Sequence, residues 1–348
     1  MAIDFGQHQT SLCENDGNRG MYHARRAGTL SLILVSLFVL PARAGLFGLG
    51  GRSSRKMAAP PVDEGGVRKT VSLYFEALHE CDGSKFDQMW HPAGKLFGVR
   101  ESEVVVREAE EFRAGATKRG QSKAEEYTRH DKILCLTMLG DATAAAKVQI
   151  ALPPAPDSPF PSIVPTLYTD YLVLLRDQRL GWRVMSKIFS ASSLHDPFTS
   201  PPNLPSDFAE VAGTLWDGYR ALNRAGSKAG LMQILYPTAQ ISYVAEDNEA
   251  CVESCEQFVA RIAQRWELPL HTPYAHLQAD STAASADTIL SIDFAGPGAA
   301  LAQVCVGAPP VLSTEFHSLL KVGNRWRVVA KTSFRQPFLV REAREERQ

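Results

Sequence analysis

An internal repeat constrains this chain most, because two similar halves predict one fold used twice. The segment LLRDQRLGWRVMSKIF at 174–189 matches LLKVGNRWRVVAKTSF at 319–334 with one gap. Lys187 of the first segment recurs as Lys331 in the second, 144 residues later. We therefore predict a tandem duplication.

The repeat also extends upstream of these segments. HPAGKLF at 91–97 parallels YPTAQIS at 236–242, and the matches keep the same order along the chain. A length of 348 residues is enough for two domains. We expect these domains at 67–197 and 207–340, joined by a Pro-rich linker at 198–206.

Composition excludes several classes of protein. The 37 basic and 38 acidic residues nearly cancel, which argues against a non-specific nucleic-acid partner. A hydrophobic content of 45% is enough for two ordinary cores. Six cysteines are too sparse for a disulfide scaffold.

Residues 1–60 are typical of a targeting segment and linker rather than of a domain. The apolar run 30–40 is too short to span a bilayer, follows two arginines and precedes Ala42 and Ala44. We predict a signal peptide that starts at Met21 and is cut after Ala44, with no stable membrane span in the mature protein. Onward transport to a plastid is one destination; secretion, or anchoring by 30–40, is the alternative.

Each copy is predicted to form helices first and strands afterwards, which indicates an α+β fold. Three N-terminal helices are expected in each copy, the second stopping before Pro92 or Pro237. The third helix is expected to carry Val105, Ala109 and Phe112 in the first copy. In the second copy it is expected to carry Cys251, Cys255, Phe258, Val259 and Ile262.

Four strands are expected after the helices of the first copy, at 132–139, 142–152, 166–176 and 182–190. A Pro-rich loop interrupts them after the second strand. In the second copy, the Gly-rich segment 295–310 is expected to form the corresponding long loop.

The first copy resembles the nuclear transport factor 2-like superfamily, and within it the SnoaL-like, lumazine-binding-like branch. The residues that carry the resemblance are Tyr74, Phe86, His91-Pro92, Ala142–Val148, Asp170-Tyr171-Leu172, Trp182 and Lys187. The second copy departs from the pattern, with Tyr236 in place of His91 and Glu315 in place of Asp170.

The resemblance implies two tandem cone-shaped domains, each a curved, mostly antiparallel sheet around its helices, with an apolar pocket for a small molecule. It also implies pairing through the sheets, so the two copies would form an intramolecular pseudo-dimer. The superfamily includes isomerases, dehydratases, cyclases, binding proteins and docking modules, so the fold alone does not select a function.

Asp170 and Lys187 are the most suggestive polar pair. Strand alternation predicts that Asp170 shares a face with Tyr168, Leu172 and Leu174. On the following strand, the same rule groups Lys187 with Arg183 and Met185, and separates it from Trp182, Val184 and Ile188. A carboxylate in an apolar cone would suit a general base, whereas a cross-strand ion pair at the sheet edge would be structural.

An enzyme of this class would use Asp170, His91 and Tyr168 as its catalytic residues. The predicted ligand-binding residues are Tyr74, Trp90, His91, Phe97, Tyr168, Asp170 and Lys187. The aromatic members would stack on a flat ligand, or would simply be core.

No cofactor or metal is predicted from the sequence. Cys251 and Cys255 have helical spacing and no second Cys/His pair nearby, which favours core thiols over a zinc site. Phosphate-loop, zinc-protease and serine-hydrolase motifs do not occur.

Three functions are consistent with the sequence. We favour a non-catalytic protein that binds a small apolar or aromatic molecule in the first domain. The alternatives are an isomerase, dehydratase or cyclase acting on an apolar ketone or lactone, and a scaffolding module.

Overall fold

The computed structural model describes residues 62–100, 102–118, 129–153, 165–194, 205–220, 227–245, 247–267, 287–308 and 311–337. These residues belong to one compact unit. The predicted signal peptide lies outside the described residues. Within the described ranges, no helix has the length and apolar character needed to cross a bilayer.

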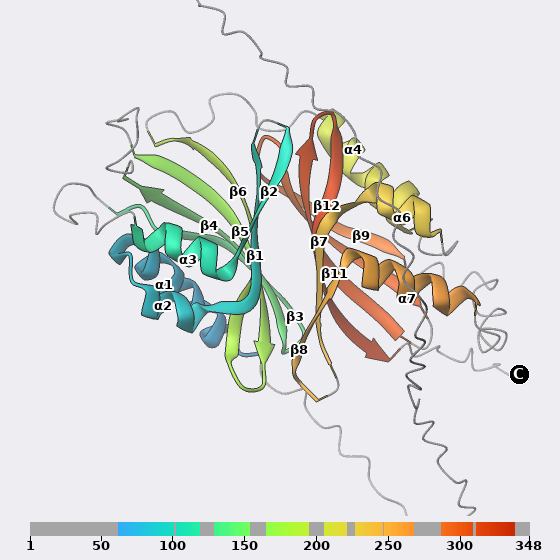
Figure 1. Cartoon of the computed structure of the whole chain (residues 1–348), viewed down its shortest axis with the longest axis horizontal. Helices are drawn as coiled ribbons and strands as arrows, with labels where there is room; N and C mark the ends of the chain where they lie inside the picture. The colour runs from blue at the N-terminus through green and yellow to red at the C-terminus, as the bar shows by residue number, and fades with distance from the viewer. Residues whose placement is uncertain are drawn as a thin grey trace, which may run out of the picture. The chain divides into compact units, whose positions relative to one another are not determined.

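The first domain is a six-stranded sheet with three helices (Figure 1). Its elements are α1 (Glu64–Glu80), α2 (Gly83–Met89), β1 (Trp90–Arg100), β2 (Glu103–Glu108), α3 (Ala109–Lys118), β3 (Lys132–Leu139), β4 (Thr143–Leu152), β5 (Thr166–Asp177) and β6 (Gly181–Ser193). The strand order is β2-β1-β6-β5-β4-β3.

The second domain repeats this plan. Its elements are α4 (Pro205–Gly213), the π-helical segment η1 (Thr214–Arg220), α6 (Lys228–Ile234), β7 (Leu235–Val244), β8 (Ala250–Ser254), α7 (Cys255–Glu267), β9 (Thr288–Gly296), β10 (Ala299–Ala308), β11 (Val311–Val322) and β12 (Arg325–Pro337). The order β8-β7-β12-β11-β10-β9 is equivalent to that of the first sheet.

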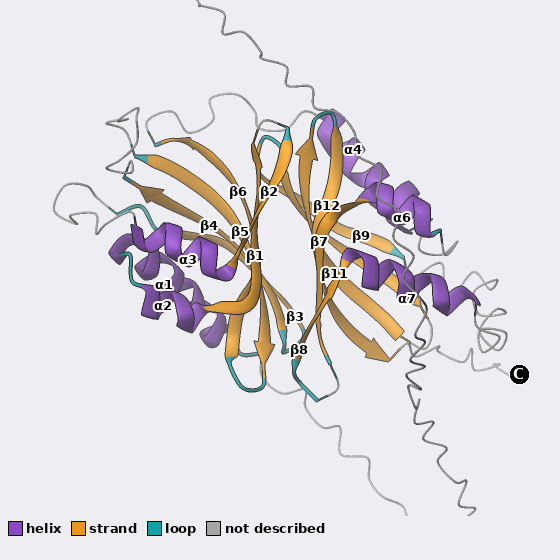
Figure 2. Ribbon diagram, in the orientation of Figure 1, coloured by secondary structure: helices purple, strands orange, loops and turns teal. Residues whose placement is uncertain are grey.

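Both sheets are mixed but mostly antiparallel. The parallel pairs are β1 with β6 and β7 with β12. In each pair, a strand near the start of the domain lies beside the last strand of the same domain. The helices of each domain cover one face of its own sheet (Figure 2). The α+β fold and the tandem arrangement predicted from the sequence are therefore confirmed.

The start of α1 is fixed by a cap that also reaches the sheet. The Asp63 carboxylate accepts a hydrogen bond from the Gly66 backbone N–H at 2.9 Å, which satisfies one of the free donors of the first turn. Its other oxygen accepts one from Trp182 Nε1 at 3.0 Å. The repeated tryptophan thus ties the last strand of the domain to its first helix.

The expectation that Val105 belongs to the third helix was wrong. Val105 lies in β2, and α3 begins only at Ala109. Cys251 likewise lies in β8, and Cys255 opens α7. In both copies, apolar residues three to four positions apart lie partly on a strand and partly on the helix that follows it. Their spacing therefore resembles one face of a helix although they do not share a helix.

The Gly-rich segment of the second copy is also not a long loop. Residues 295–310 contain the end of β9, a tight turn at Gly298 with a φ of 78°, and all of β10. Small residues such as Ala300 and Ala302 are fully buried there, because the strand packs closely beneath the helices.

A β-bulge changes which residues of β6 face the helices. Val173 pairs with Ser186, but Leu174 pairs with Val184, so Met185 is the extra residue. The bulge brings Lys187 onto the same face as Trp182 and Val184, contrary to simple alternation. The same shift occurs in the second domain, where the pairings Ser318–Ala330 and Leu319–Val328 leave Val329 over.

The two sheets pack together through the faces that their helices leave open. A buried apolar cluster joins Phe97, Tyr171 and Ile188 of the first domain to Phe316 and Val329 of the second. Its partners include Phe334, whose ring would lie 2.4 Å from a Cβ at Gly140. Gly140 has a φ of 64°, so this turn needs glycine for both its conformation and its contact.

Polar contacts surround this cluster. Lys147 Nζ lies 3.0 Å from both carboxylate oxygens of Asp293. The Gln240 side chain donates to the Ala93 carbonyl at 2.8 Å, and the Ala250 N–H donates to Asp177 at 2.9 Å. The contact between the domains therefore has an apolar centre and a polar rim.

Candidate functional site

Three side chains of the first domain form a buried polar network. Tyr74 comes from α1, Asp170 from β5 and Lys187 from β6. The Tyr74 hydroxyl donates to Asp170 Oδ2 at 2.5 Å, and Lys187 Nζ donates to the Tyr74 hydroxyl at 2.6 Å. Lys187 Nζ also lies 3.0 Å from Asp170 Oδ2.

The predicted meeting of Asp170 and Lys187 is confirmed, but it is not at a sheet edge. β5 and β6 are the two central strands, and Asp170 is fully buried. Among the described residues, only its Oδ2 is hydrogen-bonded, and Oδ1 is buried without a partner. A lone buried charge would be very costly, so each member of the pair depends on the other.

Aromatic rings enclose the Lys187 ammonium. It lies 5.2 Å from the ring centre of Tyr74, 5.4 Å from Phe112, 5.8 Å from Tyr168 and 5.3 Å from Phe189. The negative faces of such rings attract a cation, and the attraction grows where water is excluded. The cage therefore helps to hold the ammonium at this position.

A cavity of about 350 Å³ opens beside this cage. This volume lies within the range of about 300–1,000 Å³ for small-molecule sites. Its wall is mainly apolar and includes Leu78, Leu96, Val105, Phe112, Leu152 and Phe189. The polar side chains that line it are Tyr168, Lys187, Arg100 and Arg107.

The cavity brings together Tyr168 and Lys187 among the predicted site residues. Tyr74 and Asp170 lie behind Lys187 and contact it directly, but they do not line the cavity. Asp170 therefore supports the ammonium from behind rather than facing the space that a ligand would occupy.

The other three predicted residues lie elsewhere. Trp90 packs in the core, stacked on Phe86 at 5.4 Å. Phe97 points to the opposite face of β1, into the cluster between the domains. His91 is the second residue of β1 rather than the end of a helix, and its Nδ1 accepts the Ala93 N–H at 3.1 Å. Burial lowers the pKa of His91, with Asp177 opposing the shift.

Sequence reasoning missed several residues of the cavity wall. Phe112 was expected in the third helix and Phe189 ends the repeated segment 174–189, but nothing in their spacing indicated a ligand site. Leu96, Val105 and Arg107 belong to β1 and β2, which were not predicted as strands. These residues line the cavity together because β1 and β2 form an antiparallel hairpin.

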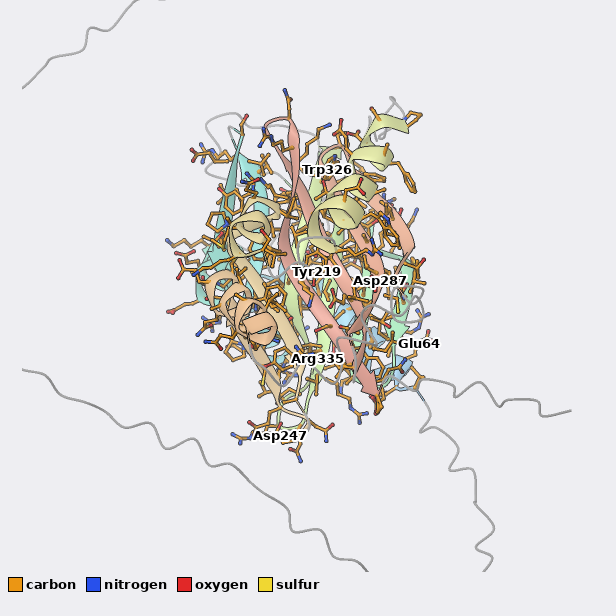
Figure 3. All side chains as sticks on the ribbon, turned by 90° about the vertical axis from the view of Figure 1, so that its right-hand side faces the viewer. Glu64, Tyr219, Asp247, Asp287, Trp326 and Arg335 are labelled. Carbon is orange, nitrogen blue, oxygen red and sulfur yellow. The ribbon has the colours of Figure 1, made fainter. Side chains whose placement is uncertain are left out.

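The second domain holds an equivalent network that is larger and more polar. The Tyr219 hydroxyl donates to Glu315 at 3.1 Å, and Lys331 Nζ lies 2.8 Å from the same carboxylate. Tyr219 precedes Glu315 by 96 residues, as Tyr74 precedes Asp170. Two further partners are Ser313 at 2.9 Å and His317 at 2.8 Å. Figure 3 labels Tyr219 on the side of the second domain.

Burial and charge act against each other in this second network. Burial alone would raise the pKa of Glu315, but Lys331 and His317 outweigh it and hold the pKa below its usual value. Burial lowers the pKa of His317 and of Lys331, although the nearby Glu315 carboxylate opposes both shifts.

These shifts predict a loss of stability in mild acid. An unfolded histidine gains its proton below a pH of about 6.5, whereas buried His317 resists it, so the free energy of unfolding should fall as the pH drops from 7 to 5. His317→Leu, which introduces the residue found at the equivalent Leu172, should flatten this slope by up to about 1.4 kcal/mol per pH unit. Urea denaturation at each pH measures it.

The same experiment carries its own control. Above a pH of about 7.5 both chains hold a neutral residue at 317, so the two slopes should agree there. Equal slopes of the two proteins between pH 7 and 5 would contradict the assignment of a neutral buried His317. The depressed pKa of Glu315 should add a further loss of stability at still lower pH in both proteins.

The space equivalent to the cavity differs in the second domain. Register places Tyr243 where the first domain has Gly98. The guanidinium of Arg335 lies 3.9 Å from the centre of the Tyr243 ring, and the Tyr243 hydroxyl donates to Glu253 at 3.2 Å. In the first domain Gly98 lines the cavity instead, and the Phe189 ring lies 3.0 Å from where a Cβ of Gly98 would be.

Both copies of the repeat match one protein family. The family model described as "Putative lumazine-binding" matches the chain twice, over residues 62–190 and 209–334. Together these matches cover most of the sequence, and the chain belongs to this family. The two matches fall on the two copies of the repeat, so the chain holds the domain of this family twice.

Solved structures similar to this chain have low sequence identity. A nuclear transport factor 2-like protein of unknown function from Silicibacter pomeroyi is 16% identical, with a TM-score of 0.30, and the match covers 37% of this chain and 94% of that one. A ketosteroid isomerase-like protein from Erwinia carotovora atroseptica is 13% identical, with a TM-score of 0.30 and coverage of 36% and 94%. A search of the curated proteins found no match.

The cysteines do not add a site. Burial raises the pKa of Cys255 to about 11, and its Sγ lies 3.6 Å from Met232 Sδ, as expected of a core thiol. Cys251 is half-buried on β8. The part of the chain that the structure describes holds no cluster of His, Cys, Asp and Glu suited to a metal ion.

Proposed function

We propose that this chain binds a small, mainly apolar molecule in the cavity of its first domain, and that its second domain is a structural partner. The observation that carries the proposal is the apolar cavity of about 350 Å³ with a single enclosed ammonium beside it. Apolar walls with a few fixed polar groups are the usual form of such sites.

The role of Lys187 in this proposal is to orient the ligand. Its ammonium lines the cavity and is held by Asp170, Tyr74 and the aromatic cage. A fixed donor of this kind would bind a carbonyl or hydroxyl oxygen of the ligand. The surrounding rings would stack on the ligand's flat apolar part.

The second candidate function is that of an isomerase or dehydratase, and one observation favours it. The free oxygen of Asp170 is a buried hydrogen-bond acceptor that no described side chain uses. Asp170 does not line the cavity, however, and its other oxygen is bonded by Tyr74 and Lys187. His91, the predicted proton shuttle, does not line it either. We therefore favour binding.

The neutral fluorophore N-phenyl-1-naphthylamine tests the proposal. It should bind with a Kd of about 10–200 µM, as expected of a ligand of its size, and its fluorescence should rise. Val105→Trp places an indole in the cavity wall and should weaken binding at least tenfold, by steric exclusion. The matched control Leu134→Trp adds the same side chain at an exposed strand position and should bind like the parent.

Two outcomes would contradict the proposal. One is the absence of binding by the folded parent protein. The other is equal binding by the Val105→Trp and Leu134→Trp variants, which would place the fluorophore outside the cavity. Circular dichroism on each variant separates lost binding from lost folding.

A further inference from the structure

We propose that the ligand of the first domain is an anionic amphiphile, whose acidic group is bound by Arg107 at the cavity mouth while its apolar part lies inside. This inference rests on the proposed function, because it names the chemical class of ligand for the same cavity. It starts from the charge of the lining. Among the described residues that line the cavity, three are cationic and none is acidic.

Of the three cations, Lys187 is already neutralised. Its ammonium contacts the Asp170 carboxylate at 3.0 Å, so it contributes a hydrogen-bond donor rather than a net charge. Arg107 differs, because within the described part of the chain its guanidinium has no carboxylate partner. Lys95 of the same β1–β2 hairpin, by contrast, is paired with Glu108 at 2.9 Å.

The position of Arg107 aims it at the ligand space. Arg107 pairs in register with Leu96, and residues directly opposite each other on antiparallel strands point to the same face. Leu96 is buried in the core of the first domain and lines the cavity, so Arg107 extends from the inner face of the sheet. Its exposed end reaches water, as a site for an acidic headgroup requires.

The equivalent position of the second domain carries the opposite charge. The register partner of Ile241, equivalent to Leu96, is Glu253. That carboxylate is satisfied within the protein, by Arg261 at 2.9 Å and by the Tyr243 hydroxyl at 3.2 Å. The first domain has instead Arg107, which has no carboxylate partner among the described residues and lines the cavity.

One acidic residue, Glu103, lies on the same strand as Arg107, on the other side of the cavity-lining Val105. Glu103 pairs with Arg100, two register pairs beyond the Gly98–Val105 pair that lines the cavity. Arg107 lies on the other side of that pair. A carboxylate, sulfonate or phosphate beside the Leu96–Arg107 pair would therefore meet Arg107 rather than Glu103, and a guanidinium binds such groups through two parallel hydrogen bonds.

The test compares two fluorophores of nearly the same shape. 8-Anilinonaphthalene-1-sulfonate carries an acidic group that N-phenyl-1-naphthylamine lacks. The parent protein should bind the sulfonate more tightly than the neutral compound. Arg107→Gln should weaken sulfonate binding about three- to tenfold, as expected for one charge-assisted contact at an exposed site, and should change binding of the neutral compound less than twofold.

Two controls make the outcome specific. Arg325→Gln removes the same charge from an exposed position of the second domain and should leave both affinities unchanged. Val105→Trp should weaken both compounds, which places the sulfonate in the cavity rather than on the surface. Equal loss of sulfonate affinity in Arg107→Gln and Arg325→Gln would overturn the inference, because it would show a general effect of charge.

The inference and the proposed function fail in different ways. Suppose that the neutral compound binds in the cavity, but the protein does not prefer the sulfonate or Arg107→Gln does not weaken its binding. The inference of an anionic ligand is then wrong, and the proposed binding function stands. If neither compound binds the folded parent protein, both are wrong.

Discussion

Substituting Lys187 by methionine is expected to lower the free energy of unfolding by about 3–5 kcal/mol, which is the usual cost of removing one partner from a buried ion pair. The substitution keeps most of the side-chain volume but leaves the fully buried Asp170 carboxylate without its counter-ion. Only Tyr74 would still donate to it. Urea denaturation followed by circular dichroism measures the change.

The companion experiment removes the whole network. The triple substitution Tyr74→Phe, Asp170→Leu and Lys187→Met should recover stability to within about 2 kcal/mol of the parent, because no buried polar group is then left alone. Lys147→Met is the matched control. It removes the partner of exposed Asp293 and should cost less than about 1 kcal/mol. A triple variant less stable than Lys187→Met alone would contradict this account of the network.

Substituting Phe316 by alanine is expected to cost about 3–5 kcal/mol, in a single unfolding transition that involves both domains. Phe316 is 2% exposed and belongs to the apolar cluster between the two sheets, so the cavity left behind would weaken both. The exposed Leu290→Ala on β9 is the control and should change stability by less than about 0.5 kcal/mol.

The mass of the protein in solution completes that prediction. If the two copies form an intramolecular pseudo-dimer, the sheet faces are already covered, and light scattering should give the mass of one chain for the parent and for Phe316→Ala. Separate unfolding transitions for the two domains, with little effect of Phe316→Ala, would instead indicate that the cluster contributes little to stability.

The repeat allowed most of the fold to be predicted. Because Trp182 and Lys187 recur in order with Trp326 and Lys331, a single α+β unit could be assigned twice, and four strands of the first copy were placed to within a few residues. The meeting of Asp170 with Lys187 followed from the neighbouring positions of their strands.

The elements that were missed have mixed local signals. β1 contains Pro92, Gly94 and Gly98, which normally weaken a strand. Gly94 is needed there because a Cβ would lie 2.8 Å from the Val184 carbonyl oxygen. β2 is followed directly by a helix, so Val105 and Phe112 share a helical spacing without sharing a helix.

The cavity could not be predicted because it depends on backbone irregularities. The bulge at Met185 turns Lys187 toward the helices, and alternation alone would have placed it with the other face. Phe97 was predicted to bind ligand, and its sequence neighbours Leu96 and Gly98 do line the cavity. Its own side chain points to the other face of β1 and packs between the domains. Arg107 gave no signal, since a single arginine in a short apolar run is unremarkable until its register with Leu96 is known.

The number of ligand sites per chain tests the central claim most directly. Calorimetric titration of the parent protein with N-phenyl-1-naphthylamine should give one site per chain, and Val105→Trp should abolish it. This result is expected because the cavity of about 350 Å³ lies in the first domain, whereas the Arg335 guanidinium lies 3.9 Å from the centre of the Tyr243 ring at the equivalent position of the second. Two equal sites, or one site that survives Val105→Trp, would contradict a binding function located in the first domain.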